Sequence, residues 1–540
     1  TGNESGDAYM IDGAEAPGKS MATDLDIGST YELSNVDIST LAVSGDAATA
    51  TILAGAAGSS QVYFSTDGGS NWERSAKEPT GKSKTCVVMA ANFSRSGKAY
   101  AATSGTDSAF SVTQDGGVTW NQIGLIDTDI STIVDLAISP NYSRDDTLFM
   151  LTYGGKHSLW RSSNDGDSWE RMFSSPLADV NRINLVELPP RYGSSQSVFL
   201  AGISNGTPVI WRSTDSGQSF TRRSAPLPID IWAVVNDTTL LIGSYDGSNG
   251  LVYRTTNSGL TYSTPAVTGN QSLNSITLSP DYDDDETILV GSTDGWVYWS
   301  EDDGDSFEPL PPDATSPPLT GVISVAFDPN YSQNNTVYAA SDTAGEGIYR
   351  FIIGTSDTWE SIDSTLPSDS MLGQLMVSTE GTLYATNFKA DGGMERCLNP
   401  TYSSGPTFET VTCGLDDGAK LCGLWWYGYR LWSVDTSNVS LMTYTDGLAL
   451  PVTLASPPDE APDIGTITNH TITNVSLDWE TLSGATKYQW QLDYDTDFST
   501  VPTEFEGNTK ASSARLPALE PATTYYWRVR ATTPTPSPWS

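Results

Sequence analysis

A ten-residue stretch, FSTDGGSNWE at 64–73, returns along the chain in altered copies and constrains the fold more than any other feature. Each copy ends in an aromatic residue, and successive aromatics stand 42 to 52 residues apart. A near-constant period of this length is typical of a repeat architecture, in which one structural unit is built many times. The closing aromatics are Trp72, Trp120, Trp169, Phe220, Tyr262, Phe307 and Trp359, the last in a decayed copy.

A second marker runs in phase with the first. In LAISPNYSRDDTLFML (136–151), ITLSPDYDDDETILVG (276–291) and VAFDPNYSQNNTVYAA (325–340), an apolar strand leads into a Pro-Asn/Asp-Tyr turn, a polar cluster and another strand. Alternating apolar and aromatic residues between Gly, Asn and Asp turns predict β structure throughout, with no helix longer than a turn or two. Each repeat therefore holds four short strands, which is one blade of a β-propeller.

The period predicts nine such units. Their first strands are expected to begin near Val36, Ser83, Thr132, Arg182, Ile231, Leu273, Val322, Leu372 and Lys420. The last two units lack a recognisable box, and propellers usually have about four to eight blades. We therefore expect eight or nine blades over residues 36–454, with residues 1–35 as the candidate source of a ring-closing strand.

The pattern changes after ASPPDEAPDIG (455–465), which is rich in Pro and acidic residues and is interpreted as a linker. Residues 466–540 hold two strand groups, with Trp479 placed as a core residue. The motif LxPxTxY at 519–525 resembles a fibronectin type III domain, whose tyrosine hydroxyl holds the corner before a core strand. No last strand is evident before Ser540, so the sequence leaves open that this domain is truncated here.

The box pattern Ser/Thr-x-Asp-x-Gly-x-x-Trp/Phe resembles the Asp-box, or BNR, repeat of sialidases, some β-glucan hydrolases, sortilin-type receptors and many surface propellers. The resemblance spans roughly residues 36–360 and implies an all-β fold, an Asp-box β-propeller of eight or nine four-stranded blades plus a C-terminal fibronectin type III-like β-sandwich. It also implies that the box turns lie on the rim, away from the ligand face. The box residues are Ser65, Asp67, Gly69, Trp72, Thr113, Asp115, Gly117, Trp120, Ser162, Asn164, Gly166, Trp169, Ser213, Asp215, Gly217, Phe220, Thr255, Asn257, Gly259, Tyr262, Ser300, Asp302, Gly304 and Phe307.

The chemistry of the box favours a structural role. An Asp or Asn in a tight turn accepts backbone N–H bonds, Gly relieves a positive φ, and the aromatic packs between strands. Asn replaces Asp at Asn164 and Asn257. A hydrogen-bond acceptor survives that exchange, whereas a carboxylate needed for proton transfer does not. The boxes are therefore predicted to be scaffold and not catalytic.

Charge and residue usage exclude several other functions. The 66 acidic and 27 basic residues give a formal net charge of −39, which disfavours nucleic acid and anionic lipid as partners. No apolar run is long enough to predict direct membrane insertion. The two His residues, His157 and His470, are far apart and no Cys-x-x-Cys pair occurs, so neither a zinc site nor a Ser-His-Asp triad is expected.

Two kinds of glycoside hydrolase need separate consideration. A sialidase would need an Arg triad, but the early Arg-Ile-Pro signature is absent and the arginines repeat at one blade position, which favours strand pairing. These arginines are Arg161, Arg212, Arg254 and Arg350. A β-glucan-hydrolase-like enzyme needs only two well-placed carboxylates on the central face. This hydrolase is the alternative function that the sequence leaves open.

The acidic turn at Asp283, Asp284 and Asp285 has oxygen ligands at a density suited to Ca²⁺. Its spacing is not that of an EF-hand, and a solvated acidic turn is the alternative interpretation. No cofactor is expected to be required, and Ca²⁺ is the one ion for which the sequence offers a candidate site.

Several features point outside the cell. The chain starts at Thr1 without Met, which suggests a processed protein. Cys397 and Cys413 lie close enough in sequence for a disulfide, and buried free thiols are the alternative. Asn-x-Ser/Thr sequons are frequent, and several fall on predicted turns. The candidate glycosylation sites are Asn92, Asn141, Asn205, Asn236, Asn270, Asn330, Asn334, Asn438, Asn469 and Asn474.

From these observations we expect a non-enzymatic extracellular protein that is a structural or adhesive component of a cell-surface layer or another extracellular assembly. Its expected partners are other surface proteins or copies of itself, together with glycans. The expected contacts are made by the propeller.

Overall fold

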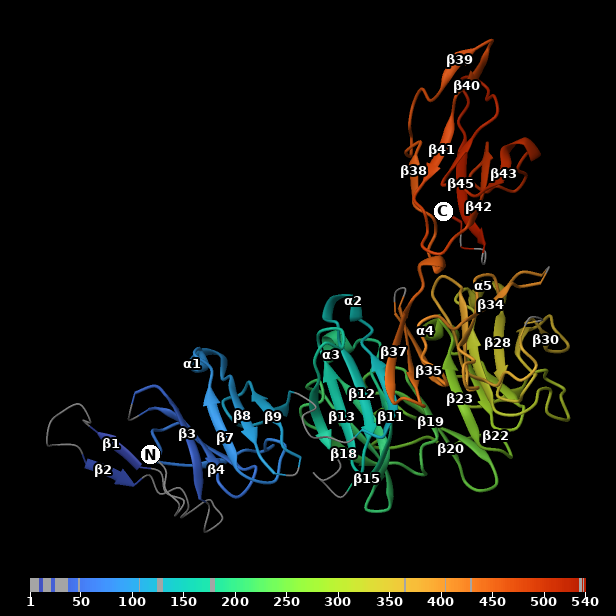
Figure 1. Ribbon diagram of the computed structural model, residues 1–540. Coiled ribbons are helices and arrows are strands. Elements are labelled where there is room, and N and C mark those ends of the chain that lie inside the picture. Colours follow the sequence, from blue (N-terminus) through green and yellow to red (C-terminus); the bar gives the residue numbers. More distant parts are fainter. Residues whose placement is uncertain are drawn as a thin grey trace. The chain divides into compact units, whose positions relative to one another are not determined.

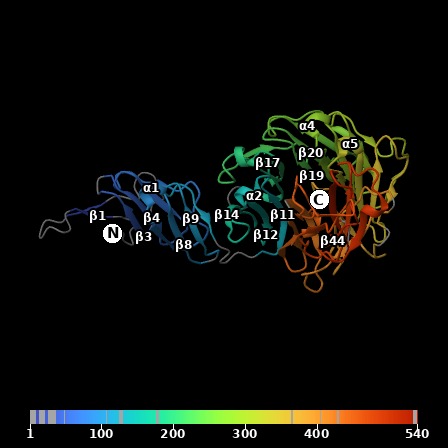
Figure 2. The same cartoon turned by 90° about the horizontal axis from the view of Figure 1, so that it is seen from above.

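The computed structural model describes residues 9–12, 21–24, 37–46, 49–105, 107–123, 130–174, 180–363, 366–403, 405–427, 430–533, 537 and 539–540. The chain forms two compact units, Thr1–Arg223 and Ser224–Ser540, and each is described by itself. The fold is all-β, as predicted, and its repeated strand groups are visible in Figures 1 and 2.

Within the described residues, nine successive antiparallel groups follow one another, and we number them blades one to nine in chain order. In the first unit the strands are β3 (Ile38–Ser44), β4 (Thr51–Ala56), β5 (Val62–Ser65) and β6 (Glu73–Arg74); β7 (Thr85–Met89), β8 (Ala99–Thr103), β9 (Phe110–Thr113) and β10 (Asn121–Gln122); β11 (Thr132–Ile138), β12 (Leu148–Tyr153), β13 (His157–Ser162) and β14 (Glu170–Ser174); and β15 (Val180–Glu187), β16 (Val198–Ser204), β17 (Thr207–Ser213) and β18 (Thr221–Ser224). Blades two and three also join edge to edge, because β10 pairs with β14 at Gln122 and Arg171.

Blades five to nine belong to the second unit. Their strands are β19 (Ile231–Val234), β20 (Leu240–Tyr245), β21 (Gly250–Thr255) and β22 (Ala266–Gly269); β23 (Leu273–Leu278), β24 (Ile288–Ser292), β25 (Val297–Ser300) and β26 (Glu308–Pro309); β27 (Ile323–Phe327), β28 (Thr336–Ser341), β29 (Ile348–Ile352) and β30 (Glu360–Ser361); β31 (Leu372–Val377), β32 (Leu383–Asn387), β33 (Met394–Cys397) and β34 (Phe408–Val411); and β35 (Leu421–Tyr427), β36 (Arg430–Asp435) and β37 (Ser440–Thr445). Among the described residues, blade nine alone has three strands.

The repeat read from the sequence is confirmed by these groups. The predicted first strands start within two residues of β7, β11, β15, β19, β23, β27, β31 and β35, and only the first predicted start, Val36, lies outside the described residues. The register succeeds because each strand alternates sides and an apolar layer shared with a neighbouring blade covers one or both sides of each blade, which makes a one-residue slip costly.

The hydrophobic core is a series of separate layers between consecutive blades. One layer holds Leu53, Val62 and Phe64 of blade one against Val87 and Ala101 of blade two. Corresponding layers lie between blades three and four, five and six, six and seven, seven and eight, and eight and nine. The core is thus distributed along the repeat and is not gathered at one centre.

The second sequence marker forms a single helical turn before the second strand of five blades. These turns are α1 (Phe93–Ser96), α2 (Tyr142–Asp145), α3 (Tyr192–Ser195), α4 (Tyr282–Asp285) and α5 (Tyr331–Asn334). Each turn ends in a residue in the left-handed conformation whose N–H bonds back to the carbonyl of the first aromatic residue. This closure stops the helix after one turn, as the sequence predicted.

The C-terminal part of the second unit is a β-sandwich (Figure 1). One sheet has the order β38-β41-β44, the other β43-β42-β45, and β39 and β40 form a hairpin. The strands are β38 (Leu454–Ser456), β39 (Thr466–Thr468), β40 (Thr471–Thr473), β41 (Ser476–Trp479), β42 (Lys487–Asp493), β43 (Glu506–Thr509), β44 (Ser513–Arg515) and β45 (Tyr526–Thr533). Because β38 pairs with β41, the sandwich begins at Leu454, the last residue expected in the propeller, and its first strand runs into the expected linker at 455–465.

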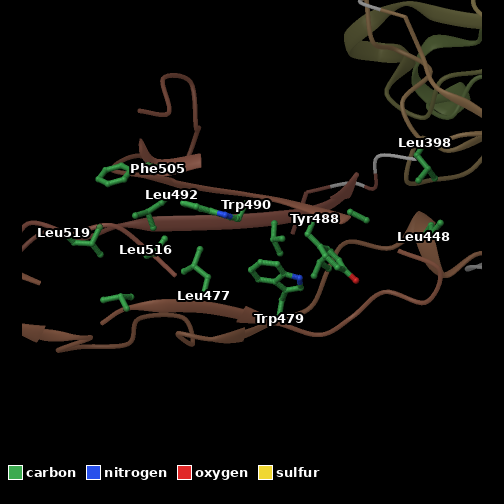
Figure 3. Close-up of a cluster of buried hydrophobic side chains, with 14 of the residues drawn as sticks. Leu398, Leu448, Leu477, Trp479, Tyr488, Trp490, Leu492, Phe505, Leu516 and Leu519 are labelled. Atoms are coloured by element: carbon green, nitrogen blue, oxygen red, sulfur yellow. The ribbon is translucent and has the colours of Figure 1, made fainter. Parts of the chain in front are cut away.

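Trp479 lies in the sandwich core as predicted, packed edge to face on Tyr488 with ring centroids 5.6 Å apart (Figure 3). The hydroxyl of Tyr525 accepts the N–H of Glu520 at 2.9 Å, which is the corner that the 519–525 motif predicts. The same core cluster includes Leu398 and Leu448 from the end of the blades. The sandwich is therefore joined to blades eight and nine by shared apolar packing and not by a free linker alone.

In the N-terminal segment the structure describes two short strands, β1 (Tyr9–Asp12) and β2 (Met21–Asp24), which pair with each other. The rest of residues 1–35 lies outside the described residues, and the ring-closing role stays a prediction. In the part of the chain that the structure describes, no helix has the length and apolar character that crossing a membrane would require.

Candidate functional site

The box turns use their polar groups internally. In blade one, Ser65 Oγ donates to Asp67 Oδ1 at 2.9 Å and accepts the N–H of Gly69 at 2.9 Å. Asp67 Oδ1 also accepts the N–H of Asn71 at 2.9 Å, and Oδ2 accepts its side-chain amide at 2.6 Å. The Ser/Thr bonds recur in the boxes that start at Thr113, Ser162, Ser213, Thr255 and Ser300. Both carboxylate oxygens are therefore engaged in holding the turn.

The turn also explains why Asn serves in two copies. Asn164 Oδ1 accepts the N–H of Ser168 at 3.0 Å, and Asn257 Oδ1 accepts that of Thr261 at 2.9 Å, as Asp does elsewhere. Their side-chain amides donate to the same residues' hydroxyls at 2.9 and 2.7 Å. The box turn needs a hydrogen-bond acceptor at Oδ1 of the Asp or Asn. The second polar atom of that side chain must bond to the side chain four residues later, and no negative charge is required.

We expect Asp67→Asn to leave stability within about 1 kcal/mol of the parent, whereas Asp67→Ala costs about 1–2 kcal/mol because the N–H of Asn71 loses its acceptor. Bonds from the side chain and backbone of Asn71 hold the pKa of Asp67 below its ordinary value, so at neutral pH the carboxylate is charged. Denaturant titration of the full chain, with hydrogen exchange in β5 and β6 to localise the effect, measures this difference. An Asn variant as damaging as the Ala variant would show that the charge itself is required.

The box aromatics reach the preceding blade. Trp120 Nε1 donates to Ser75 Oγ at 3.2 Å, and Ser75 directly follows β6 of blade one. Trp359 Nε1 donates to the carbonyl of Leu310, directly after β26 of blade six, at 2.9 Å. Trp72 and Trp120 are buried, and Trp169, Phe220, Tyr262 and Phe307 are half-buried. The box therefore fastens one blade to the one before it as well as holding its own turn.

The repeated arginines reach in the opposite direction. Arg161 donates to the carbonyl of Ser216, in the box of the next blade, at 3.0 Å. Arg254 forms an ion pair with Asp303 in the next box, and Arg350 donates to the carbonyl of Pro400 at 2.7 Å. These arginines lie one per blade between successive blades, so they do not converge on a substrate carboxylate.

The helical turns contact the boxes of their own blades. The hydroxyl of Tyr142 bonds to Asp165, that of Tyr282 bonds to Asp303, and that of Tyr192 lies 3.2 Å from Ser216 Oγ. In these three blades the two sequence markers are in phase because they contact each other.

The acidic turn considered for Ca²⁺ is α4. Asp285 accepts the hydroxyl of Ser279 at 2.5 Å and the N–H of Thr287 at 3.0 Å, while Asp283 and Asp284 are exposed. Over the described residues, no group of three or more His, Cys, Asp or Glu side chains is arranged to hold a metal ion. Asp285 is used in the turn, and Ca²⁺ binding stays a prediction.

Most sequon asparagines are accessible. Asn92, Asn141, Asn205, Asn236, Asn270, Asn330, Asn438, Asn469 and Asn474 are exposed, and Asn334 is half-buried. The side-chain amide of Asn334 donates to Asp328 at 2.8 Å. Asn92, Asn141 and Asn330 stand directly before a helical turn, where their side chains make no capping bond.

The expected disulfide between Cys397 and Cys413 is wrong in this structure, where both thiols are free. In the β33–β34 hairpin, Cys397 lies opposite Phe408 and Met394 lies opposite Val411. Cys413, two residues beyond Val411, is therefore at the other end of the hairpin from Cys397, beyond the reach of a disulfide.

The thiols should differ in reactivity. Cys397 is buried, and burial raises its pKa to about 12, whereas Cys86 and Cys413 are exposed. We expect a maleimide to label Cys86 and Cys413 in the native chain and Cys397 only after denaturation. Mass spectrometry of labelled peptides reads this out, and a 397–413 disulfide found without reduction would restore the original prediction.

Polar side chains on first strands also join neighbouring blades, a feature that we did not anticipate. Asp135 lies at a bulge in β11, where Oδ1 accepts the N–H of Leu136 at 2.9 Å and Oδ2 accepts that of Val186 in blade four at 2.8 Å. Gln374 accepts the N–H of Leu424 in blade nine at 3.0 Å. The sequence signal that could have found these contacts is a polar residue within the otherwise apolar first strand of a blade.

Burial raises the pKa of Asp135 to about 7. The folded chain then binds a proton more tightly than the unfolded chain, so this contribution to stability is present below about pH 4 and is lost as the pH rises to about 7. We expect Asp135→Asn to remove this part of the pH dependence, because an amide oxygen still accepts a backbone N–H. Unfolding midpoints between pH 4 and pH 8 test it, and equal slopes for both proteins would contradict it.

The two carboxylates whose pKa is raised to about 7, Asp135 and Glu395, are engaged in internal hydrogen bonds. The pKa of exposed Glu301 is also raised, by partial burial and by the nearby carboxylates of Glu308, Asp285 and Asp302. Burial raises the pKa of Glu395 to about 7, but the side chain is 1% exposed and accepts the hydroxyl of Thr410. Both oxygens of Asp135 accept backbone N–H groups of strands. A polysaccharide cannot reach Glu395, and both oxygens of half-buried Asp135 are already used in joining strands.

A buried charged network joins blades eight and nine. Arg396 Nη1 lies 2.7 Å from Asp446 Oδ1 and 2.7 Å from the hydroxyl of Tyr444, and Nη2 pairs with Glu409. Asp446 Oδ2 accepts the hydroxyl of Tyr384 at 2.8 Å, and its Oδ1 caps the short 3₁₀ helix Gly447–Ala449. This network lies at the exit from the last blade toward the sandwich.

An open apolar pocket lies beside this network, between blades eight and nine. Its volume is about 90 Å³. The walls are mostly apolar and sulfur-bearing, and exposed Cys413 and Gly414 stand at its surface. The lining residues are Met394, Val411, Cys413, Gly414, Leu415, Leu421, Leu424, Leu431, Trp432, Ser433, Met442, Thr443 and Tyr444. This pocket, next to the outer strand β37, is the candidate binding site.

No protein-family model matches the chain, and no curated protein is significantly similar to it. Among solved structures, the chain is similar to YCF48 from Cyanidioschyzon merolae (15% identity, 58% of this chain and 95% of that one, TM-score 0.42). It is similar to YCF48 bound to D1 peptide (14% identity, 60% and 95%, TM-score 0.44). It is also similar to Sqt1 from Chaetomium thermophilum (17% identity, 65% and 93%, TM-score 0.43). Similarity at this level transfers no function, so the site is interpreted from its own geometry.

Proposed function

We propose that this chain is a non-enzymatic extracellular scaffold, an Asp-box propeller protein with a fibronectin type III-like module, that acts as a structural or adhesive component of a cell-surface assembly. One observation carries the proposal. The box carboxylates, the repeated arginines and the buried acids are engaged within or between blades, whereas the open site is an apolar pocket beside a strand edge. Such a site suits a protein partner better than a reaction.

The partners in this proposal are other surface proteins or further copies of the chain. The net charge of −39 favours partners with basic surfaces and disfavours nucleic acid. Glycans carried on the exposed sequons, and Ca²⁺ at the acidic turn around Asp283 and Asp284, fit the same extracellular setting.

The test combines location, assembly and activity. We expect a membrane-impermeant biotin reagent to label the protein on intact source cells, and the full chain to co-sediment with cell-surface proteins or with itself. We expect the purified, Ca²⁺-supplied protein to release no reducing ends from polysaccharides. Release of reducing ends that a single Asp→Asn or Glu→Gln change abolishes would replace the scaffold by the hydrolase, and a protein found only inside the cell would overturn the proposal.

A further inference from the structure

Five blades share one packing feature that blade nine lacks. In blades two, four, six, seven and eight, an aromatic residue at the start of the fourth strand fills the gap to the preceding blade. Trp120, Phe220, Phe307, Trp359 and Phe408 take this position, and each belongs to or packs against the apolar layer shared with the preceding blade. Trp120 and Trp359 contact the residue that directly follows the preceding fourth strand.

Blade nine has no fourth strand among the described residues, because the chain leaves β37 through Asp446 into the short 3₁₀ helix. Its third strand is correspondingly exposed. No residue of β37 is fully buried, whereas all four residues of β33, the third strand of blade eight, are buried. The outer edge of β37 therefore presents backbone groups that a further strand can pair with.

The pocket lies where the missing aromatic would be. Val411, Cys413 and Leu415 belong to the end of the fourth strand of blade eight and the loop after it, which is the region that box aromatics contact in other blades. Met442 and Tyr444 of β37 form the other side. An apolar cavity of roughly 150 Å³ accepts a benzene ring. This pocket of about 90 Å³ is smaller and partly open, so an aromatic ring enters it only in part and leaves the rest of the ring outside.

The surroundings of the pocket select the charge of the occupant. Asp416 and Asp417 are exposed on the loop that lines the pocket, whereas Glu409 on β34 is already paired with Arg396. The two loop acids favour basic residues flanking the ring. Residues 1–35 of this chain hold seven acidic residues and one Lys, so they have the opposite charge to the one required.

We propose that an extended segment of a partner protein, with an aromatic residue between basic residues, adds to β37 as a fourth strand and places its ring in the pocket. This inference rests on the proposed scaffold function and names how a partner is held. Backbone pairing along β37 supplies affinity and the ring supplies specificity, as in other cases of strand addition.

The probe is a synthetic octapeptide with one central Trp flanked by Thr and Lys, compared with the same peptide carrying Ala for Trp or Glu for Lys. With the full chain, we expect the Trp peptide to slow amide exchange in Ser440–Thr445 and to slow alkylation of Cys413 while leaving Cys86 unchanged. We expect each altered peptide to bind about tenfold or more weakly. No binding of the Trp peptide at millimolar concentration, or equal binding of the Ala peptide, overturns the proposal.

Two variants test whether the peptide binds at the pocket or elsewhere on the protein. Leu415→Trp fills the pocket from within and should abolish peptide binding, whereas Val88→Trp puts the same side chain on an exposed strand of blade two and should not. If Leu415→Trp fails to fold, the Cys413 protection in the parent chain still decides the question. If exchange in β37 is already slow and becomes fast when residues 1–35 are deleted, the occupant is the chain itself and the proposal is overturned.

Different results would contradict the proposed scaffold function and the strand-addition inference. If neither the parent protein nor the Leu415→Trp variant binds the peptide, but both still co-sediment with surface proteins, only the strand-addition inference is wrong. If the parent protein neither sediments with surface proteins nor is labelled on cells, the scaffold function itself is wrong.

Discussion

Asp446→Ala should lower the stability of blades eight and nine by about 3–5 kcal/mol. Asp446 is 0% exposed and Arg396 is 3% exposed, so removing the carboxylate leaves a guanidinium buried beside it with one carboxylate, Glu409, as its remaining ionic partner. The same change removes the acceptor of Tyr384 and the cap of the 3₁₀ helix that leads to the sandwich. Hydrogen exchange in β33, β36 and β37 of the full chain localises the loss.

Two further variants test the reason for that loss. The double change Arg396→Met with Asp446→Leu should recover part of the stability, because no charge is then left without its partner in the interior. Lys389→Met breaks an ion pair with Asp369 in which both side chains are well exposed, and it should leave the unfolding midpoint unchanged. An Asp446→Ala chain with the parent's exchange rates in blades eight and nine would refute the proposed importance of the network.

Trp120→Ala is the second change with a large expected effect, about 3–5 kcal/mol. Trp120 is 1% exposed and lies in the layer between blades one and two. The truncation leaves a cavity in that layer and also removes the Nε1 bonds to Ser75 and to the carbonyl of Gly117. Denaturant titration of the full chain, with exchange in β4, β5, β8 and β9, gives the size and place of the effect.

The matched variants separate packing from hydrogen bonding. Trp120→Phe keeps most of the apolar volume and loses the Nε1 bonds, so we expect a cost nearer 1–2 kcal/mol, roughly that of the lost bonds and the smaller ring. Trp169→Ala removes a half-buried box aromatic and should cost less than Trp120→Ala. If Trp169→Ala were as damaging as Trp120→Ala, burial between blades would not be what the box aromatic contributes.

The sequence was a good guide wherever the interactions are local. The hydrogen bonds of the box join residues no more than four positions apart, such as Ser65 to Gly69 and Asp67 to Asn71. The spacing of these residues in the sequence was therefore enough to predict the turn. The one-turn helices close over the same span. The repeat also carries strand order, because consecutive strands of a blade are neighbours in sequence and in space.

The sequence was a poor guide to contacts between blades. Closeness in sequence suggested that Cys397 and Cys413 could bond, but hairpin register puts them at opposite ends of two strands. The partners Arg396 and Asp446 are 50 residues apart, and no local pattern links them. The Asp283–Asp285 run was read as one ligand group, but the turn uses Asp285 for its own closure and leaves the other two in solvent.

By itself, the sequence determined the repeat, the four-stranded unit, the turn chemistry and the change to a sandwich after the blades, because each depends on periodicity and on bonds within a few residues. Only the tertiary structure decided that the box aromatics and the arginines fasten one blade to the next, that a charged network is buried at the end of the repeat, and that blade nine keeps an open edge beside a pocket. Those features depend on which faces meet across 45 to 55 residues of chain, and that information is held in packing and not in local pattern.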